Sequence, residues 1–121
     1  MRMHIIPAIK LTEGRDFEGR WVLRDKINGP VDFTEVIGGE TWSATFRMAA
    51  KLSDDPLVSK AATLTSAGAI VVDMTASEFA DLIVPPVIGG AQVGVFQIEI
   101  TSPLPDLSQI WQGPVHLSGV I

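Results

Sequence analysis

Strict alternation of apolar and polar residues predicts two β-strands in this chain. The segment 41–48 turns four apolar residues to one face and places polar residues between them. The four apolar residues are Trp42, Ala44, Phe46 and Met48. The segment 96–101, which ends just before Ser102 and Pro103, alternates equally well. A period of two is typical of a strand with one buried and one exposed face.

Weaker patterns predict further strands around turn residues. The segments 59–65 and 69–74 flank Ser66, Ala67 and Gly68, which indicates a hairpin whose glycine supplies a positive φ. Gly38 and Gly39 mark another turn. A last strand is expected to turn Val115, Leu117, Gly119 and Ile121 to one face. Short strands are also expected at 5–11, 20–24 and 31–34.

One helix is predicted between the strands. Thr75 and Glu78 have the spacing of a capping box, and Met74 and Phe79 are placed as the hydrophobic staple around it. A short apolar stripe follows and ends at a pair of prolines. The stripe and its terminator are Phe79, Leu82, Ile83, Pro85 and Pro86. We therefore expect one short connecting α-helix near residues 75–83.

Length and composition fit one mostly β domain. The chain has 121 residues, of which 46% are hydrophobic and 19% charged, with 11 glycines and 8 prolines. This length suits one domain with a real core, and many turns favour short strands over long helices. The predicted fold is a small antiparallel β-sandwich, Ig-like or similar, spanning residues 1–121. A partly open barrel is the alternative.

Charge and cysteine content disfavour several partners. The net charge is −5 and the nine basic residues are scattered. Nucleic acids and anionic lipids need a basic face, so we expect neither as a partner. The absence of cysteine excludes disulfides and thiolate ligands. No apolar run approaches the ~20 residues that span a bilayer, and the N-terminus lacks a signal peptide. A cytoplasmically made protein is therefore expected.

No residue set predicts catalysis. His4 and His116 are the only histidines and no nucleophile elbow accompanies them; His116 is expected on the outer face of the last strand. A pair of carboxylates for glycoside hydrolysis could come from Asp73, Glu78 and Glu99. Glu78 is explained by the capping box and Glu99 by the polar face of a strand. We expect a non-enzymatic protein, although an unrecognised hydrolase stays a competing reading.

Metal, cofactor and sugar sites are not predicted either. Asp54 and Asp55 indicate a solvated turn, because no calcium-loop spacing surrounds them. The glycine doublets lack the lysine of a phosphate loop. Surface tryptophans form sugar platforms, but Trp42 is in phase with the core and Trp21 has apolar neighbours. Trp111, just before a Gly-Pro pair, is the tryptophan left open for exposure.

Apolar residues crowd both ends of the chain. Chain ends are usually polar and frayed unless something ties them down. These residues therefore predict either terminal strands of the fold or an interface with a neighbouring subunit. With Trp111, they make up the expected interface: Met1, Met3, Ile5, Ile6, Trp111, Val120 and Ile121.

The order of five segments resembles small tail proteins of bacteriophages and prophages. The segments are GPVDFT at 29–34, TWSATFR at 41–47, GAIVVDMT at 68–75, VFQIEI at 95–100 and WQGPVHL at 111–117. The chain is most similar to the N-terminal domain of siphophage baseplate upper proteins and to tail-fibre connector proteins, over roughly residues 20–121. It departs from them in having Val95 and Phe96 where a Tyr-Asp pair is common. It also ends at Ile121, before their fibre-binding region, so that part is expected on another polypeptide.

The resemblance implies a non-enzymatic virion protein without cofactors. Its role would be an adaptor in a phage tail tip or baseplate, made in the host cytoplasm, that docks tail or fibre proteins. Identical copies would assemble in a ring or trimer, where symmetry adds up modest contacts. The alternative is a carbohydrate- or peptide-binding β-sandwich module, because a fold alone does not decide function.

Overall fold

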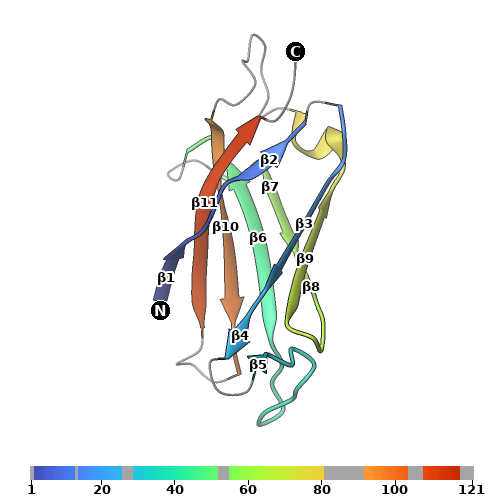
Figure 1. The fold of residues 1–121 in the computed structure, drawn as a ribbon, viewed down its shortest axis with the longest axis vertical. Helices are drawn as coiled ribbons and strands as arrows, with labels where there is room; N and C mark the ends of the chain where they lie inside the picture. Colours follow the sequence, from blue (N-terminus) through green and yellow to red (C-terminus); the bar gives the residue numbers. More distant parts are fainter. Residues whose placement is uncertain are drawn as a thin grey trace.

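The computed structural model describes residues 2–12, 14–25, 29–51, 55–80, 92–103 and 108–117. Strands make up most of this part of the chain and run along the long axis of the molecule (Figure 1). They are β1 (Arg2–Ile5), β2 (Ile9–Leu11), β3 (Phe17–Val22), β4 (Arg24–Asp25), β5 (Gly29–Pro30), β6 (Ser43–Ala49), β7 (Val58–Ala61), β8 (Thr63–Leu64), β9 (Ala69–Met74), β10 (Gln92–Thr101) and β11 (Gln109–Leu117). The expectation of a mostly β protein is confirmed.

The larger sheet contains six strands in the order β1-β11-β10-β6-β7, with β2 also paired to β11. Pairing is antiparallel from β11 through β10 and β6 to β7. By contrast, β1 and β2 run parallel to β11. The sheet is therefore mixed, which corrects the expectation of a purely antiparallel fold. The first and last strands are far apart in sequence, so no short hairpin forces them to be antiparallel.

The smaller sheet has the antiparallel order β3-β9-β8, and β4 pairs separately with β5. The predicted turn at 66–68 is confirmed, with Gly68 at φ +81°. A Cβ at Gly68 would lie 2.7 Å from the Leu23 carbonyl oxygen, so its position needs a glycine on two counts.

The predicted strand 59–65 is corrected, because it divides between the two sheets. The strand β7 pairs with β6 in the larger sheet, whereas β8 pairs with β9 in the smaller one. At the crossing, the Ala62 amide donates to the Ala44 carbonyl oxygen at 3.0 Å. One continuous segment thus joins the two sheets at this side.

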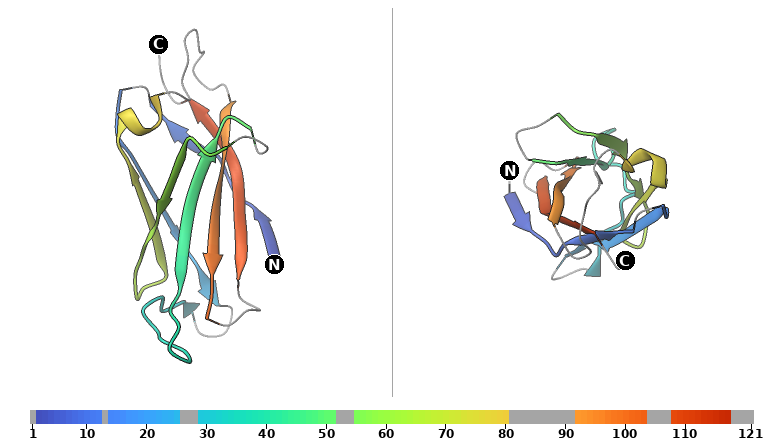
Figure 2. Two further views of the ribbon diagram at one scale, coloured as in Figure 1. Left: turned by 180° about the vertical axis from the view of Figure 1, so that it is seen from behind. Right: turned by 90° about the horizontal axis from the view of Figure 1, so that it is seen from above.

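Buried residues of both sheets form one hydrophobic cluster. The predicted inward face of 41–48 is confirmed, since its four apolar residues are all buried. The cluster contains Phe46, Phe96 and Ile98 from the larger sheet and Ile70 and Val72 from the smaller one. Seen from above, the strands surround this common interior (Figure 2).

The predicted helix is corrected to a 3₁₀ turn, Ala76–Glu78. Its capping contacts are present in part as expected: the Thr75 amide donates to Glu78 Oε1 at 2.9 Å. Met74 and Phe79 are each 1% exposed, as the staple predicts. Phe79 takes φ −114° and ψ 10°, outside the helical region, so the turn ends there. Residues 82–86 lie outside the described residues.

The short strand predictions have mixed outcomes. The segment 5–11 divides into β1 and β2, and 20–24 divides into the end of β3 and β4. The segment 31–34 is a turn, because the Asp32 side chain accepts a hydrogen bond from the Thr34 amide at 2.9 Å. The hydrogen bond from the Thr34 hydroxyl and then that from the Thr34 amide lower the pKa of Asp32. The turn at Gly38 and Gly39 is confirmed, with φ +63° and +81°.

Candidate interaction edge

The strand β1, at one side of the larger sheet, carries two exposed apolar side chains. Met3 is 57% exposed and Ile5 is 74% exposed. They align with Ile110 and Gln112 of β11, so both lie on the same face of the sheet. Among the described strands, β1 pairs with β11 alone, and Figures 1 and 2 show it on the outer side of β11. We call residues Arg2–Ile5 the β1 edge.

The edge strand changes character at Pro7. Ile6 is partly buried and packs against the core, while Ile9 and Leu11 on β2 are 6% and 0% exposed. The Ile6 amide donates to the Gln112 carbonyl oxygen at 2.8 Å. In a parallel pair the next bond would run from residue 114 back to Ile6. Pro114 has no N–H, which explains why the pairing is interrupted between β1 and β2.

Gly113 lets the two chains approach closely at this interruption. A Cβ at this position would lie 2.7 Å from the Ile6 carbonyl oxygen and 2.8 Å from the Phe96 ring. Real side chains do not reach such distances, so a larger residue would displace the edge strand or the core aromatic ring.

Trp111 does not belong to the exposed edge, which corrects the expectation that it forms part of an exposed interface. It is 8% exposed and lies in the core cluster. Its indole N–H donates to Gln109 Oε1 at 2.8 Å. The reason is its phase on β11, since it alternates in step with the buried residues Val115 and Leu117. Met1, Val120 and Ile121 lie outside the described residues.

The other two tryptophans are also turned inward. Trp42 is 8% exposed and its ring lies edge-on to Phe33, with ring centroids 5.1 Å apart. Trp21 is partly buried, with its ring centroid 5.9 Å from that of Phe96. An exposed platform of three tryptophans is therefore not present.

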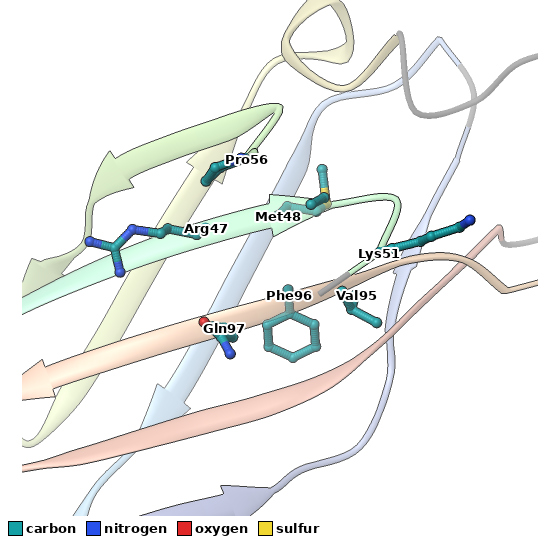
Figure 3. A pocket seen from close by; sticks show the side chains of 8 residues that line it. Arg47, Met48, Lys51, Pro56, Val95, Phe96 and Gln97 are labelled. Carbon is teal, nitrogen blue, oxygen red and sulfur yellow. The ribbon is translucent and has the colours of Figure 1, made fainter. Parts of the chain in front are cut away.

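A small hollow lies on β6 and β10 near the start of β7 (Figure 3). It holds about 50 Å³, far below the roughly 300–1,000 Å³ of drug-sized ligand pockets. Arg47 and Gln97 lie along its polar side, and Lys51 lies at its far end. Arg47 also forms an ion pair with Glu99, with Nη1 and Oε2 3.7 Å apart. The hollow is therefore too small to hold a drug-sized ligand.

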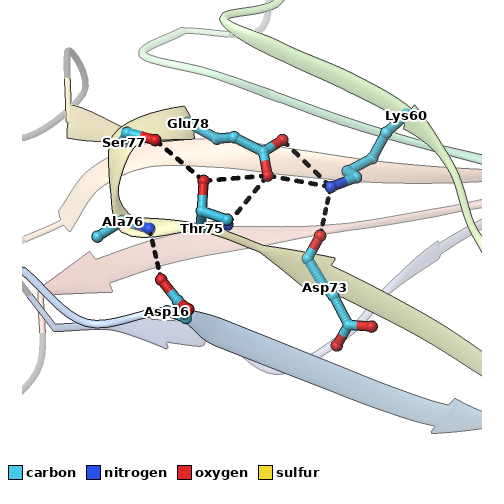
Figure 4. A network of polar contacts seen from close by, with 7 residues as sticks. All are labelled: Asp16, Lys60, Asp73, Thr75, Ala76, Ser77 and Glu78. Atoms are coloured by element: carbon cyan, nitrogen blue, oxygen red, sulfur yellow. Dashed lines mark hydrogen bonds and ion pairs between the residues drawn. The ribbon is translucent and has the colours of Figure 1, made fainter.

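At the opposite side of the larger sheet, Lys60 on β7 joins a polar network (Figure 4). Its ammonium group donates to both carboxylate oxygens of Glu78, at 3.1 and 3.2 Å, and to the Asp73 carbonyl oxygen. Asp16 accepts from the Ala76 amide at 2.9 Å. The network connects β7 of the larger sheet with the end of β9 and the turn after it. We call residues Val58–Ala61 the β7 edge.

The contacts of this network favour the ionised form of the Glu78 carboxyl group. The hydrogen bond from the Thr75 amide and then that from Lys60 lower the pKa of Glu78. A general acid in glycoside hydrolysis needs a raised pKa, which is the opposite direction. Neither Lys60 nor its contact with Glu78 was predicted from the sequence, because Lys60 lies on β7 and Glu78 in the turn after β9, and no sequence pattern links the two.

Among the described residues, the remaining candidate catalytic and metal-binding side chains do not lie close together. His4 aligns with Trp111 on β11, whereas His116 aligns with Lys10 on β2, five residues further along β11. His116 is partly exposed between buried neighbours, as predicted. Asp55 is exposed, and Asp54 lies outside the described residues. Within the described ranges, no three His, Asp or Glu side chains are grouped to hold a metal ion.

No family model, curated protein or solved structure matches this chain. In the part of the chain that the structure describes, no helix is long and apolar enough to cross a membrane. The resemblance to phage tail proteins therefore stays a prediction.

Proposed function

We propose that this chain is a non-enzymatic structural protein of a bacteriophage tail tip or baseplate, an adaptor that docks neighbouring tail or fibre proteins. The observation that carries the proposal is the β1 edge, where Met3 and Ile5 are exposed and no described strand pairs on the side away from β11. Natural proteins usually shield such edges with charges, bulges or covering loops. An edge strand with two exposed apolar side chains suits a protein whose edge is covered in an assembly.

The architecture we propose for this role is an Ig-like β-sandwich. In Ig domains, two sheets pack face to face over a shared core. The orders β11-β10-β6 and β3-β9-β8, with a common hydrophobic cluster, agree with this arrangement. Trp42, buried directly before β6, agrees with the buried tryptophan of the corresponding Ig strand. Such a rigid framework would hold the β1 edge in a fixed position.

The side-chain chemistry also supports a structural role. Glu78 and Lys60 hold the two sheets together at the β7 edge, and Glu99 pairs with Arg47 on the surface of the larger sheet. The partners we propose are tail or fibre proteins and further copies of the chain in a ring or trimer. The location would be the virion tail, after synthesis in the host cytoplasm.

The peptide-binding alternative has one observation in its favour. An edge strand with free backbone groups accepts an extended peptide as an added strand. The β1 edge therefore suits a peptide as well as a subunit. A carbohydrate-binding role loses its main argument, since all three tryptophans are buried or partly buried.

The proposed function can be tested on phage particles purified from the bacterium that encodes the chain. An antibody against the folded chain should label one end of the tail in electron micrographs. Mass spectrometry of purified particles should detect the chain at a fixed ratio to the main tail protein. A chain that is expressed but absent from purified particles would overturn the proposal. Particles from a deletion strain are the control for labelling.

A further inference from the structure

We infer that the β1 edge pairs with the same edge of a second copy of this chain. The two strands would run antiparallel around a two-fold axis at His4, so that the larger sheet continues from one copy into the next. The inference rests on the interaction role proposed above and names the partner of this edge. A two-fold interface uses the same patch twice, so the patch must be complementary to itself.

The backbone of β1 offers an open row of donors and acceptors. The Ile6 amide points to β11, where it donates to Gln112. The N–H and C=O groups of successive residues point to alternate sides of a strand. His4 therefore turns its backbone groups to β11, whereas Met3 and Ile5 turn theirs outward. No described strand pairs on that outer side.

Only one register satisfies all of these groups within the described strand. With the axis at His4, Met3 lies opposite the second copy's Ile5, and each residue exchanges two hydrogen bonds with the other. With the axis at Ile5, Met3 would lie opposite Pro7, which has no N–H to donate. With the axis at Met3, Ile5 would lie opposite Met1, which is outside the described residues.

The same register also matches the side chains. It places Met3 and Ile5, which are 57% and 74% exposed, in apolar cross-strand pairs on one face. The first eleven residues contain Arg2, His4 and Lys10 and no acidic residue, in a chain of net charge −5. Pairing along this segment therefore brings no two carboxylate side chains of the copies opposite each other.

The pair is expected to be weak. A standard interface buries about 800 Å² on each partner, and a strand of four residues covers much less. The dimer should therefore depend on protein concentration. A closed two-fold pair also differs from a ring or trimer, which the experiment below distinguishes by mass.

Single cysteines test the register, because the chain contains no cysteine. With the axis at His4, the two His4 residues form a non-hydrogen-bonded pair with Cα atoms about 4.5 Å apart. That distance lies within the roughly 4.4–6.8 Å range of disulfides. The His4→Cys variant should therefore form a disulfide-linked dimer under mild oxidation. The exposed Ser59→Cys variant, on the β7 edge, is the matched control and should stay monomeric.

Two further variants define the register. Mixed Met3→Cys and Ile5→Cys proteins should cross-link to each other at least fivefold more than either protein does to itself. This follows because each residue faces the other and lies beyond disulfide reach of its own copy. Equal cross-linking at residues 4 and 59 would overturn the inference. Cross-linking of Met3→Cys mainly with itself would overturn the register and thus the axis at His4.

Sedimentation of the unmodified chain provides the second measurement. The mass should rise from monomer toward dimer with concentration, and Ile5→Lys should remain monomeric with an unchanged melting temperature. A monomer at every concentration up to about 1 mM, or a trimer, would overturn the inference. Because these experiments use the pure chain, their failure leaves the labelling of particles unaffected.

Discussion

The two edges of the larger sheet differ in the contacts that cover them. At the β7 edge, Lys60 reaches across to Glu78, with 3.1 Å between Nζ and Oε2, and ties the strand to the smaller sheet. The chain then continues through Ala62 into β8, so the same segment closes this side. At the β1 edge, Met3 and Ile5 are exposed and no described strand lies beyond them.

The difference shows how one sheet can have one edge that resists pairing with other chains and one edge that is open to it. A lysine at an edge strand resists pairing with other chains, because its charge would have to be desolvated. The β1 edge has no such group among its outward-facing residues, Met3 and Ile5. The anchor of the open edge lies further along the strand, at β2, where Ile9 and Leu11 are buried.

The largest expected effect distinguishes β2, whose apolar side chains are buried in the core, from β1, whose apolar side chains are exposed. Leu11→Ala should lower the free energy of unfolding by about 2–5 kcal/mol, because Leu11 is 0% exposed. Ile5→Ala should change it by less than about 0.5 kcal/mol, because Ile5 is 74% exposed. Urea denaturation of both variants measures the contrast. A similar loss in both would mean that β1 is part of the core.

The second largest loss of stability is expected at Gly113, where β11 lies close to the Ile6 carbonyl oxygen and the Phe96 ring. Gly113→Ala should destabilise the fold by about 1–3 kcal/mol, because its Cβ would meet the Ile6 carbonyl oxygen and the Phe96 ring. Thermal unfolding gives the loss, and hydrogen exchange at the Ile6 amide shows whether the edge strand has moved. An unchanged melting temperature with full protection of that amide would contradict this reading.

Much of the larger sheet was predictable from its alternation. The run from Trp42 to Met48 has one partner strand on each side and one buried face, so its period is strict. Trp111 was predictable as well, since it is in phase with Val115 and Leu117. The pair Gly113 and Pro114 left Trp111 open for exposure in the sequence, yet both residues lie within β11.

Other features left no local signal. The change of sheet at Ala62 depends on where β6 and β9 lie in space, and no turn residue marks it. The helix prediction failed because a capping box reports only how a turn begins, whereas the backbone leaves the helical region at Phe79. At the candidate site, Met3 and Ile5 were expected either in a terminal strand or in an interface, and the structure places them on β1 with both side chains exposed. The clasp between Lys60 and Glu78, 18 residues apart, was not expected.

A smaller effect is expected from opening the β7 edge. Lys60→Met should cost about 0.2–1 kcal/mol, the usual range for an exposed ion pair. Exposed Lys10→Met removes the same charge from β2 and is the control. If Lys60 also guards the edge, the Lys60→Met protein should associate more readily at high concentration. Equal behaviour of the two variants would show that the chain crossing at Ala62 protects the edge by itself.

The pH dependence of this clasp has a definite sign. The pKa of Glu78 is lowered in the folded protein from its ordinary value of 4.5. The ionised carboxylate therefore contributes stability above that value, and the contribution is lost as the pH falls through the lowered pKa. The difference in unfolding free energy between the parent protein and Glu78→Gln should shrink as the pH drops below about 4.5. A difference that grows in this range would contradict the assignment.

The smallest expected effect concerns the turn that holds Glu78 in place. The Thr75 amide donates to Glu78 Oε1 at 2.9 Å, and an alanine at this position keeps that amide. The Thr75 hydroxyl adds longer contacts, 3.1 Å to Ser77 Oγ and 3.3 Å to Glu78 Oε1. Because the turn is short and exposed, Thr75→Ala should cost about 0.5 kcal/mol, the low end for capping residues.

Chemical denaturation of Thr75→Ala beside Ser77→Ala measures this cost. Ser77→Ala removes the neighbouring hydroxyl and leaves Thr75 and Glu78 unchanged, so it should have a still smaller effect. A loss well above 1 kcal/mol in Thr75→Ala would mean that its hydroxyl, and not the backbone, positions the Glu78 carboxylate. The closure of the β7 edge would then depend on one threonine side chain, and the two edges would differ less in robustness than their contacts indicate.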